Sequence, residues 1–183
     1  MVASTQSVTE TLIVVPKEKI SLDDAANESS RVFVQLTNTL KSQPGYTRQF
    51  WGYQVENPQL FVWSIDWESL ESHTIFTKSE DYNSFKIGFD QVFDLKAVEP
   101  VILYTRFTVN EAFPAFQAAV TEVAFYTLPG GTTDEIKSSV ANGSSTVIEQ
   151  VQSIGKAEGA SLGWSEFCHH LYILHSISRS DTS

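Results

Sequence analysis

Cysteine and basic residues are scarce in this sequence, and both shortages narrow what the chain can be. Its 183 residues include one cysteine, Cys168, so no disulfide can form within the chain, which fits a reducing compartment. Only 12 Lys and Arg stand against 22 Asp and Glu, for a net charge of -10, and the basic residues are scattered. Such a chain is repelled overall by phosphate, so nucleic acid and anionic membranes are not expected partners.

Long apolar runs are absent too. No stretch approaches the roughly 20 apolar residues that a membrane helix requires. Residues 1–16 contain only a short aliphatic core with no charged region before it, which is not the pattern of a secretory signal. We therefore expect a cytoplasmic protein without a membrane partner.

Nucleotide-binding and metal-binding motifs are also missing. There is no HExxH, GxSxG or CxxC, and Gly130-Gly131 lacks the further glycines or the lysine of phosphate loops. The run Cys168-His169-His170, with His175 after it, contains metal-binding side chains. On a strand, however, His169 and His175 lie about 20 Å apart, whereas zinc ligands converge within about 2 Å of the ion. We expect neither a metal site nor a cofactor.

The composition is 42% hydrophobic and 12% aromatic, which is typical of a globular protein. The most informative stretch is 59–89. Its first part alternates between apolar and polar residues, as a strand does, and from Glu68 onward the apolar residues recur every three or four positions, as on a helix. Trp67 marks the change, Ser69 suits a helix start, and a break in the helix is expected near 79–81.

The sequence also repeats itself. The triplet Val-Thr-Glu opens an apolar run at 8–10 and another at 120–122, and residues 59–63 match 170–174 at nearly the same offset. Matches in the same order favour a tandem duplication. In the first repeat we expect strands at 9–15, 46–55, 61–67 and 98–107, a helix capped by 21–24 and ended by Pro44-Gly45, and a helix at 68–89. In the second we expect strands at 120–128, 161–167 and 171–177, and a helix from 132 to 155 that could split at Asn142-Gly143.

These orders, βαββαβ and then βαββ, predict an α+β fold class made of tandem ferredoxin-like repeats. The predicted domains are 1–107 and 118–183, and because no glycine-rich linker joins them we expect one compact unit. The second repeat lacks its last helix and strand. Its strand 120–128 would then be an open edge, through which a homodimer is expected to form.

A resemblance to a known family rests on one run and on the aromatic residues spaced after it. The run is Trp67-Glu68-Ser69-Leu70-Glu71-Ser72-His73, followed by Phe76, Ser79, Tyr82 and Phe85. With Pro44-Gly45 before the second strand, it resembles the dimeric α+β barrel superfamily and, within it, the antibiotic-biosynthesis-monooxygenase-like (ABM) domains. The resemblance implies antiparallel sheets packed face to face into an α+β barrel, in a chain similar to a fused dimer. The superfamily includes cofactor-independent monooxygenases, haem-degrading enzymes and proteins with no known reaction.

His73 is the candidate catalytic residue. It could act as a general base, or it could be a histidine satisfied at a helix–sheet boundary. Strand alternation places Trp51 and Tyr53 on one face of their strand, and Trp63 and Trp67 on one face of the next. These four side chains form either an aromatic slot for a planar ligand or packing between the two sheets of the barrel.

Two polar side chains complete the predicted ligand-binding residues. Arg48 either anchors a phenolate or carboxylate or pairs with a surface acid. Tyr82, like Tyr46 and Tyr104, is a candidate hydrogen-bond donor. The predicted function is binding of a small hydrophobic or aromatic molecule in an aromatic-lined pocket. The alternative is a cofactor-independent monooxygenase acting on aromatic or polyketide-like substrates, with His73 as base and the substrate carbanion reducing oxygen.

Overall fold

The computed structural model describes residues 7–22, 24, 26–109, 112–153, 159–165 and 170–177. Within it the chain forms two compact units, Met1–Leu103 and Tyr104–Ser183, and strand β4 (Val101–Val109) passes from one to the other. The predicted boundaries, the packing of the repeats into one unit or barrel, and the homodimer stay predictions.

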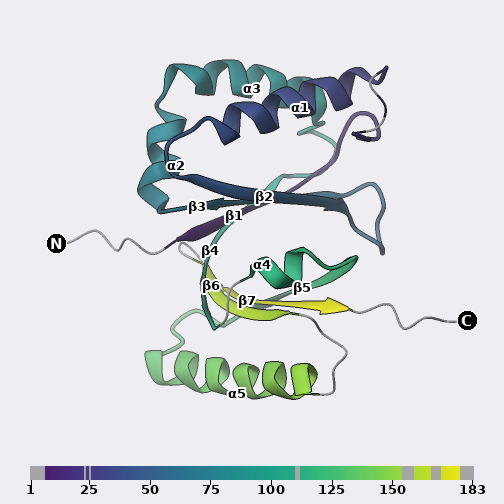
Figure 1. Cartoon of the computed structure of the whole chain (residues 1–183). Helices are drawn as coiled ribbons and strands as arrows, with labels where there is room; N and C mark the ends of the chain where they lie inside the picture. Colours follow the sequence, from purple (N-terminus) through teal and green to yellow (C-terminus); the bar gives the residue numbers. More distant parts are fainter. Residues whose placement is uncertain are drawn as a thin grey trace, which may run out of the picture. The chain divides into compact units, whose positions relative to one another are not determined.

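The first unit is an antiparallel sheet with helices on one face (Figure 1). Three of its strands lie in the order β2-β3-β1. Helices α1 and α3 lie side by side on the sheet. The elements before β4 are β1 (Val8–Val14), α1 (Glu28–Lys41), β2 (Tyr46–Tyr53), β3 (Phe61–Trp67), α2 (Leu70–Thr77) and α3 (Glu80–Val92). The order predicted for the first repeat is confirmed, with its second helix in two parts.

The starts of α1 and α2 show how side chains set helix boundaries. The Ser69 hydroxyl accepts a hydrogen bond from the Ser72 backbone N–H at 3.1 Å, so the predicted start of α2 is confirmed. The predicted cap of α1 at 21–24 is wrong, because the N-cap is Asn27. The Asp24 side chain instead accepts the backbone N–H groups of Ala26 and Asn27, which stabilises a turn before the helix.

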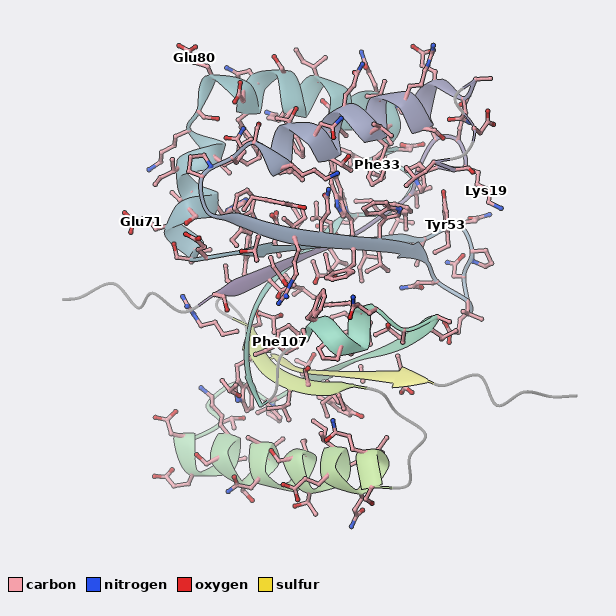
Figure 2. All side chains as sticks on the ribbon, in the orientation of Figure 1. Lys19, Phe33, Tyr53, Glu71, Glu80 and Phe107 are labelled. Atoms are coloured by element: carbon pink, nitrogen blue, oxygen red, sulfur yellow. The ribbon has the colours of Figure 1, made fainter. Side chains whose placement is uncertain are left out.

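Aromatic side chains fill the space between this sheet and its helices. Phe33 points from α1 toward the sheet (Figure 2), and its ring centroid lies 4.9 Å from that of Trp63 and 5.3 Å from that of Phe61. Trp51 lies opposite Trp63 in the β2–β3 register, so the two side chains lie on the same face of the sheet. Phe33, Trp63 and Phe61 are all fully buried, so they belong to the core of this unit.

The second unit has its own antiparallel strands, in the order β4-β6-β7-β5. Its further elements are α4 (Phe113–Phe116), β5 (Val120–Thr127), α5 (Asp134–Ser153), β6 (Ala160–Ser165) and β7 (His170–Ile177). Ile148, Ala160 and Leu162 form its described core. From β5 onward this is the predicted βαββ order, so the α+β class is confirmed for both parts of the chain.

Helix α5 is continuous through residues 142–143, so the split considered there does not occur. The two residues are exposed, and a side chain at Gly143 would meet no atom within 4 Å. A glycine inside a helix costs only about 1 kcal/mol relative to alanine, which the rest of a 20-residue helix can offset. Across the described residues, none of the helices is both long enough and apolar enough to cross a bilayer.

Candidate functional site

The first unit contains a cluster of polar and aromatic side chains, Glu10, Trp67, His73 and Tyr82, which we call the acid–histidine cluster. The Glu10 Oε2 atom accepts a hydrogen bond from Trp67 Nε1 at 3.2 Å and lies 3.5 Å from His73 Nε2. The ring centroids of Trp67 and His73 are 5.4 Å apart, edge to face. Both titratable side chains are largely buried, at 13% exposure for His73 and 10% for Glu10.

Local structure brings His73 to this place. It is the fourth residue of α2, whose first turn is fixed by the Ser69 cap. The chain before β2 also supports that turn, because the Gly45 carbonyl accepts the Glu68 backbone N–H at 2.8 Å. Gly45 has a φ of 77°, and a Cβ on it would overlap the Ser72 hydroxyl oxygen. Only glycine therefore fits beside the first turn of α2 without strain.

Burial shifts the pKa of two members of the cluster, His73 and Tyr82. It lowers the pKa of His73 from 6.5 to about 4, so the imidazole is neutral at pH 7. The pKa of the Tyr82 phenol is raised, first by burial and then by the charge of Glu10, so its hydroxyl stays protonated. A neutral imidazole has one N–H donor and one acceptor nitrogen. Because Nε2 faces a carboxylate, the proton is assigned to Nε2 and the acceptor to Nδ1.

Aromatic rings surround the polar groups. Phe76 is stacked on Trp67 at 5.8 Å and meets Tyr82 edge to face at 5.3 Å. Tyr82 is in turn stacked on Phe85 at 6.3 Å. Phe76 is 3% exposed, whereas Tyr82 and Phe85 are half-buried. The cluster thus runs from the core at Trp67 to the surface at Tyr82.

The predicted aromatic residues share the helix-facing side of the sheet, and the ring of Trp67 packs against that of His73. Trp63 and Trp67 are fully buried, and Trp51 is 37% exposed. The Tyr53 hydroxyl accepts the Ile20 backbone N–H at 2.7 Å, and burial raises its pKa. The structure therefore brings Trp67, His73 and Tyr82 together and leaves Trp51 and Tyr53 farther along the sheet.

Arg48 lies on the opposite face of the same sheet. Its Nε atom is 2.7 Å from Asp66 Oδ2, and Asp66 Oδ1 accepts the Thr9 hydroxyl at 2.5 Å. Thr11 and Ser64 continue this buried polar row, with their hydroxyl oxygens 3.2 Å apart. Because side chains alternate along β1 and β3, this row and the acid–histidine cluster occupy opposite faces.

Glu10 is the site residue that the sequence interpretation missed. Residues 8, 10, 12 and 14 share one face of β1, and three of them are buried aliphatic residues, Val8, Leu12 and Val14. A charged residue in phase with an apolar strand face was the available signal, because buried charges need a specific partner.

Other predicted features lie elsewhere. Cys168 and His169 are outside the described residues, and of His170 and His175 only the backbone, in β7, is described. Among the described side chains, no group of three or more His, Cys, Asp or Glu could hold a metal ion. Tyr46 packs on Trp67 with ring centroids 6.4 Å apart, and burial followed by the charge of Asp66 raises its pKa.

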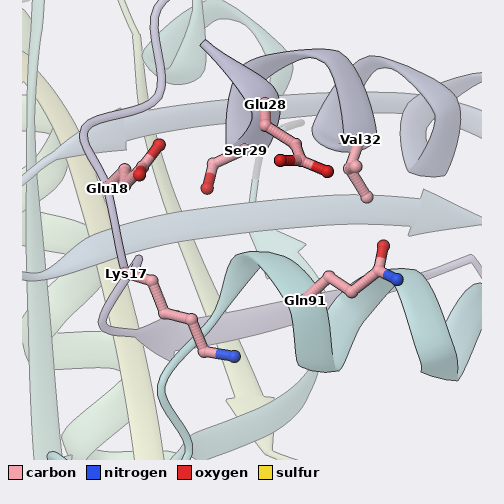
Figure 3. A pocket seen from close by; sticks show the side chains of 6 residues that line it. All are labelled: Lys17, Glu18, Glu28, Ser29, Val32 and Gln91. Atoms are coloured by element: carbon pink, nitrogen blue, oxygen red, sulfur yellow. The ribbon is translucent and has the colours of Figure 1, made fainter.

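A surface pocket of about 340 Å³ opens between the start of α1 and the end of α3 (Figure 3). Its lining is Lys17, Glu18, Glu28, Ser29, Val32 and Gln91, and none of these is a predicted site residue. The Lys17 ammonium donates to the Asp90 carbonyl at 2.5 Å and so supports the end of α3. These contacts indicate a structural role for Lys17.

No protein-family model matches the sequence, and no curated protein matches it. Solved structures do match in fold. A candidate monooxygenase from Fusobacterium nucleatum subsp. nucleatum is similar over 97% of this chain and 78% of its own, at 12% identity and a TM-score of 0.59. A candidate monooxygenase from Lactobacillus acidophilus is similar over 93% of this chain and 76% of its own, at 8% identity and a TM-score of 0.54. At such identities the likeness shows the fold alone, and the predicted monooxygenase-like α+β fold is confirmed.

Proposed function

We propose that the first unit binds a small aromatic molecule at the acid–histidine cluster and oxidises it without a cofactor, with His73 as the base. The observation that carries this is a histidine kept neutral by burial beside a buried carboxylate, in an aromatic surround. A general base must be unprotonated at the working pH, and His73 meets that condition above about pH 4. The folds of the two candidate monooxygenases support the same reaction class.

The reaction class is oxygenation of an acidic CH₂ group in an electron-rich ring system, such as that of an anthrone. His73 Nδ1 takes one proton from the CH₂ carbon, and the electron pair left on carbon reduces molecular oxygen. His73 returns this proton to the terminal oxygen of the carbon-bound peroxide and then takes the second C–H proton. The C–H electron pair forms the carbonyl as the O–O bond breaks, and the departing hydroxide takes the proton from His73 and leaves as water. One CH₂ group and one O₂ thus become one carbonyl group and one water. The substrate supplies all the electrons.

Glu10 and Tyr82 assist without taking part in bond changes. The Glu10 carboxylate fixes the tautomer by facing Nε2, and it stabilises the imidazolium that forms when Nδ1 accepts the proton. Tyr82 remains a neutral phenol and can donate a hydrogen bond to a carbonyl oxygen of the substrate. Trp67 and Phe76 are buried behind these groups, and the half-buried ring of Tyr82, 5.3 Å from Phe76, offers an aromatic surface to a planar ring.

The proposal is tested by measuring the rate of oxygen uptake with anthrone as substrate. The rate in buffer without protein is subtracted. We expect catalysed uptake of one O₂ per anthrone and formation of anthraquinone. His73→Gln should lower kcat at least 100-fold, since base catalysis contributes about 10² to 10⁴ in rate. Glu71→Gln is the matched control, because Glu71 is exposed on the same helix and points away from the sheet (Figure 2).

A binding protein without catalysis is the second candidate, and burial of the aromatic residues favours it, because Trp63 and Trp67 offer no exposed surface. Binding of anthraquinone with no uptake of oxygen above the buffer rate would support this candidate. Equal rates in wild type and His73→Gln would remove His73 from the mechanism.

A further inference from the structure

The side-chain amide of Gln49 contains a buried hydrogen-bond donor that is unpaired in the described part of the chain. The amide oxygen, Oε1, accepts the indole N–H of Trp63 at 3.0 Å. The amide nitrogen, Nε2, is buried and has no hydrogen-bond partner among the described residues. The two amide atoms cannot be exchanged, because an indole N–H is only a donor and needs an oxygen acceptor. The unpaired group is therefore the NH₂, and a buried polar group of this kind calls for an explanation.

Gln49 lies on the same face of the sheet as the acid–histidine cluster. In the strand register, Gln49 of β2 and Glu10 of β1 are both opposite Ile65 of β3, so their side chains flank Ile65 on one face. Neighbouring strands are about 4.8 Å apart, so the backbones of Gln49 and Glu10 are about 10 Å apart. A molecule of two or three fused rings bound at the cluster can span that separation.

We propose that the Gln49 amide donates a hydrogen bond to a carbonyl oxygen of the bound molecule, so that the site selects aromatic ketones over hydrocarbons of the same shape. This inference rests on the proposed function for the place of binding and adds the substrate class. A hydrocarbon offers only ring faces, which are weak acceptors, and so leaves the NH₂ group unpaired. A carbonyl oxygen has two lone pairs and can accept from Gln49 and Tyr82 together.

Aromatic side chains connect the amide with the surface end of the cluster. Phe33, Phe85 and Phe93 pack on Trp63 with ring centroids 4.9, 6.2 and 6.4 Å away. Phe33 and Phe93 are fully buried, whereas Phe85 of α3 is half-buried and is stacked on Tyr82 at 6.3 Å. A ligand that turns Phe85 aside therefore reaches Trp63 and the amide beside it, and side-chain rotations of this kind are common on binding.

The same donor would assist the proposed reaction. Removal of a proton from the CH₂ group of an anthrone spreads the negative charge onto the ketone oxygen. A donor already aimed at that oxygen stabilises the charge as it develops. We therefore expect Gln49→Met to lower kcat for oxygen uptake with anthrone about tenfold or more.

A bicyclic ketone and its hydrocarbon, 1-tetralone and tetralin, test the inference. Their binding to the full chain is measured by isothermal titration calorimetry under nitrogen. Gln49→Met keeps the length of the side chain and removes the donor, so it should lower the ratio of tetralone affinity to tetralin affinity about five- to tenfold. Gln35→Met makes the same change at an exposed position of α1 and should leave the ratio unchanged.

The carbonyl stretch of bound 1-tetralone reports the hydrogen bond directly. We expect its infrared frequency to be lower in the wild type than in Gln49→Met, because a hydrogen bond weakens the C=O bond. If Gln49→Met fails to fold, the frequency is measured in Tyr82→Phe, which removes the phenol as another donor and keeps the Gln49 amide. A frequency in Tyr82→Phe as high as that of 1-tetralone in heptane would overturn the inference.

An equal loss of affinity for both molecules in Gln49→Met would mean that Gln49 only supports Trp63, and it would overturn the inference. An affinity ratio that Gln49→Met leaves unchanged would also overturn it. Absence of binding by both molecules would reject it together with the proposed site. The expected change in ratio with no oxygen uptake from anthrone would uphold ketone selection and reject the oxygenase. Oxygen uptake with the same ratio in wild type and Gln49→Met would uphold the oxygenase and reject ketone selection.

Discussion

The stability of the chain should fall with acidification in a way that depends on His73. Its pKa is 6.5 in an unfolded chain and about 4 in the folded one. Between these values the unfolded state binds more protons, so the free energy of unfolding falls as pH falls. The contribution is fully present above pH 6.5 and lost by about pH 4. The difference corresponds to about 3 kcal/mol at the plateau, since one pKa unit is worth about 1.4 kcal/mol.

Urea unfolding at pH 7.5, 6.5, 5.5 and 4.5 measures this in wild type and His73→Gln. The variant has an amide that does not titrate. All other histidines and carboxylates titrate in both proteins, so their contributions largely cancel when the two stability curves are subtracted. We expect the wild type to lose about 2–3 kcal/mol more than the variant between pH 7.5 and 4.5. Glu71→Gln, on the same helix but exposed, should follow the wild-type curve.

Two results would refute this reasoning. Parallel curves for wild type and His73→Gln would mean that the histidine has an ordinary pKa and is not desolvated. A wild type that gains stability over the variant on acidification would mean that Glu10 holds His73 as an imidazolium. In that second case the neutral-base mechanism would fail as well, because the proton-accepting nitrogen would already be occupied at neutral pH.

Three substitutions test the surrounding structure by urea unfolding at pH 7.5. Gly45→Ala should lower the free energy of unfolding by about 2–3 kcal/mol, because a Cβ at positive φ is strained and contacts Ser72; a loss under about 0.5 kcal/mol would contradict this. Thr105→Val should leave the free energy of unfolding unchanged or raise it by up to about 1 kcal/mol, because the fully buried Thr105 hydroxyl has no hydrogen-bond partner in the described part of the chain. A clear loss of stability in Thr105→Val would mean that the hydroxyl does have a partner. Asp66→Asn should cost about 1–2 kcal/mol by weakening the contact with half-buried Arg48, and an unchanged midpoint would show that the pair contributes nothing.

The fold was predicted well for elements whose bounds depend on the residues within or beside the element itself. Strand β3 has the predicted bounds, 61–67, because its residues are apolar up to Trp63 and then alternate between polar and apolar as far as Trp67. The Ser69 cap and the break between α2 and α3 also follow from nearby residues. The start of α1 could not be predicted from nearby residues in this way. Asp24 and Asn27 are both good capping residues, and only the folded turn selects between them.

The site was less predictable, because its members come from two segments far apart in the sequence, β1 and residues 67–82. His73 was found from its place on a helix, but its partner Glu10 lies on β1, whose register against β3 no local pattern specifies. That register places Glu10 opposite Ile65, and so on the Trp67 face of the sheet. The depth of burial that makes His73 neutral also depends on this packing. Sequence alone therefore indicated a histidine, and the tertiary structure indicates its chemistry.

The two buried tryptophans of β3 argue against a purely structural reason for Glu10. Each indole N–H needs an acceptor, and Trp63 Nε1 donates to the neutral amide oxygen of Gln49 at 3.0 Å. Trp67 Nε1 donates instead to the carboxylate of Glu10 at 3.2 Å, although burying a charge costs more than burying an amide. One buried indole N–H is thus satisfied by a neutral amide, and the other by a carboxylate. His73 Nε2 lies 3.5 Å from Glu10, and in the proposed mechanism the imidazolium that forms there is stabilised by a carboxylate and not by an amide.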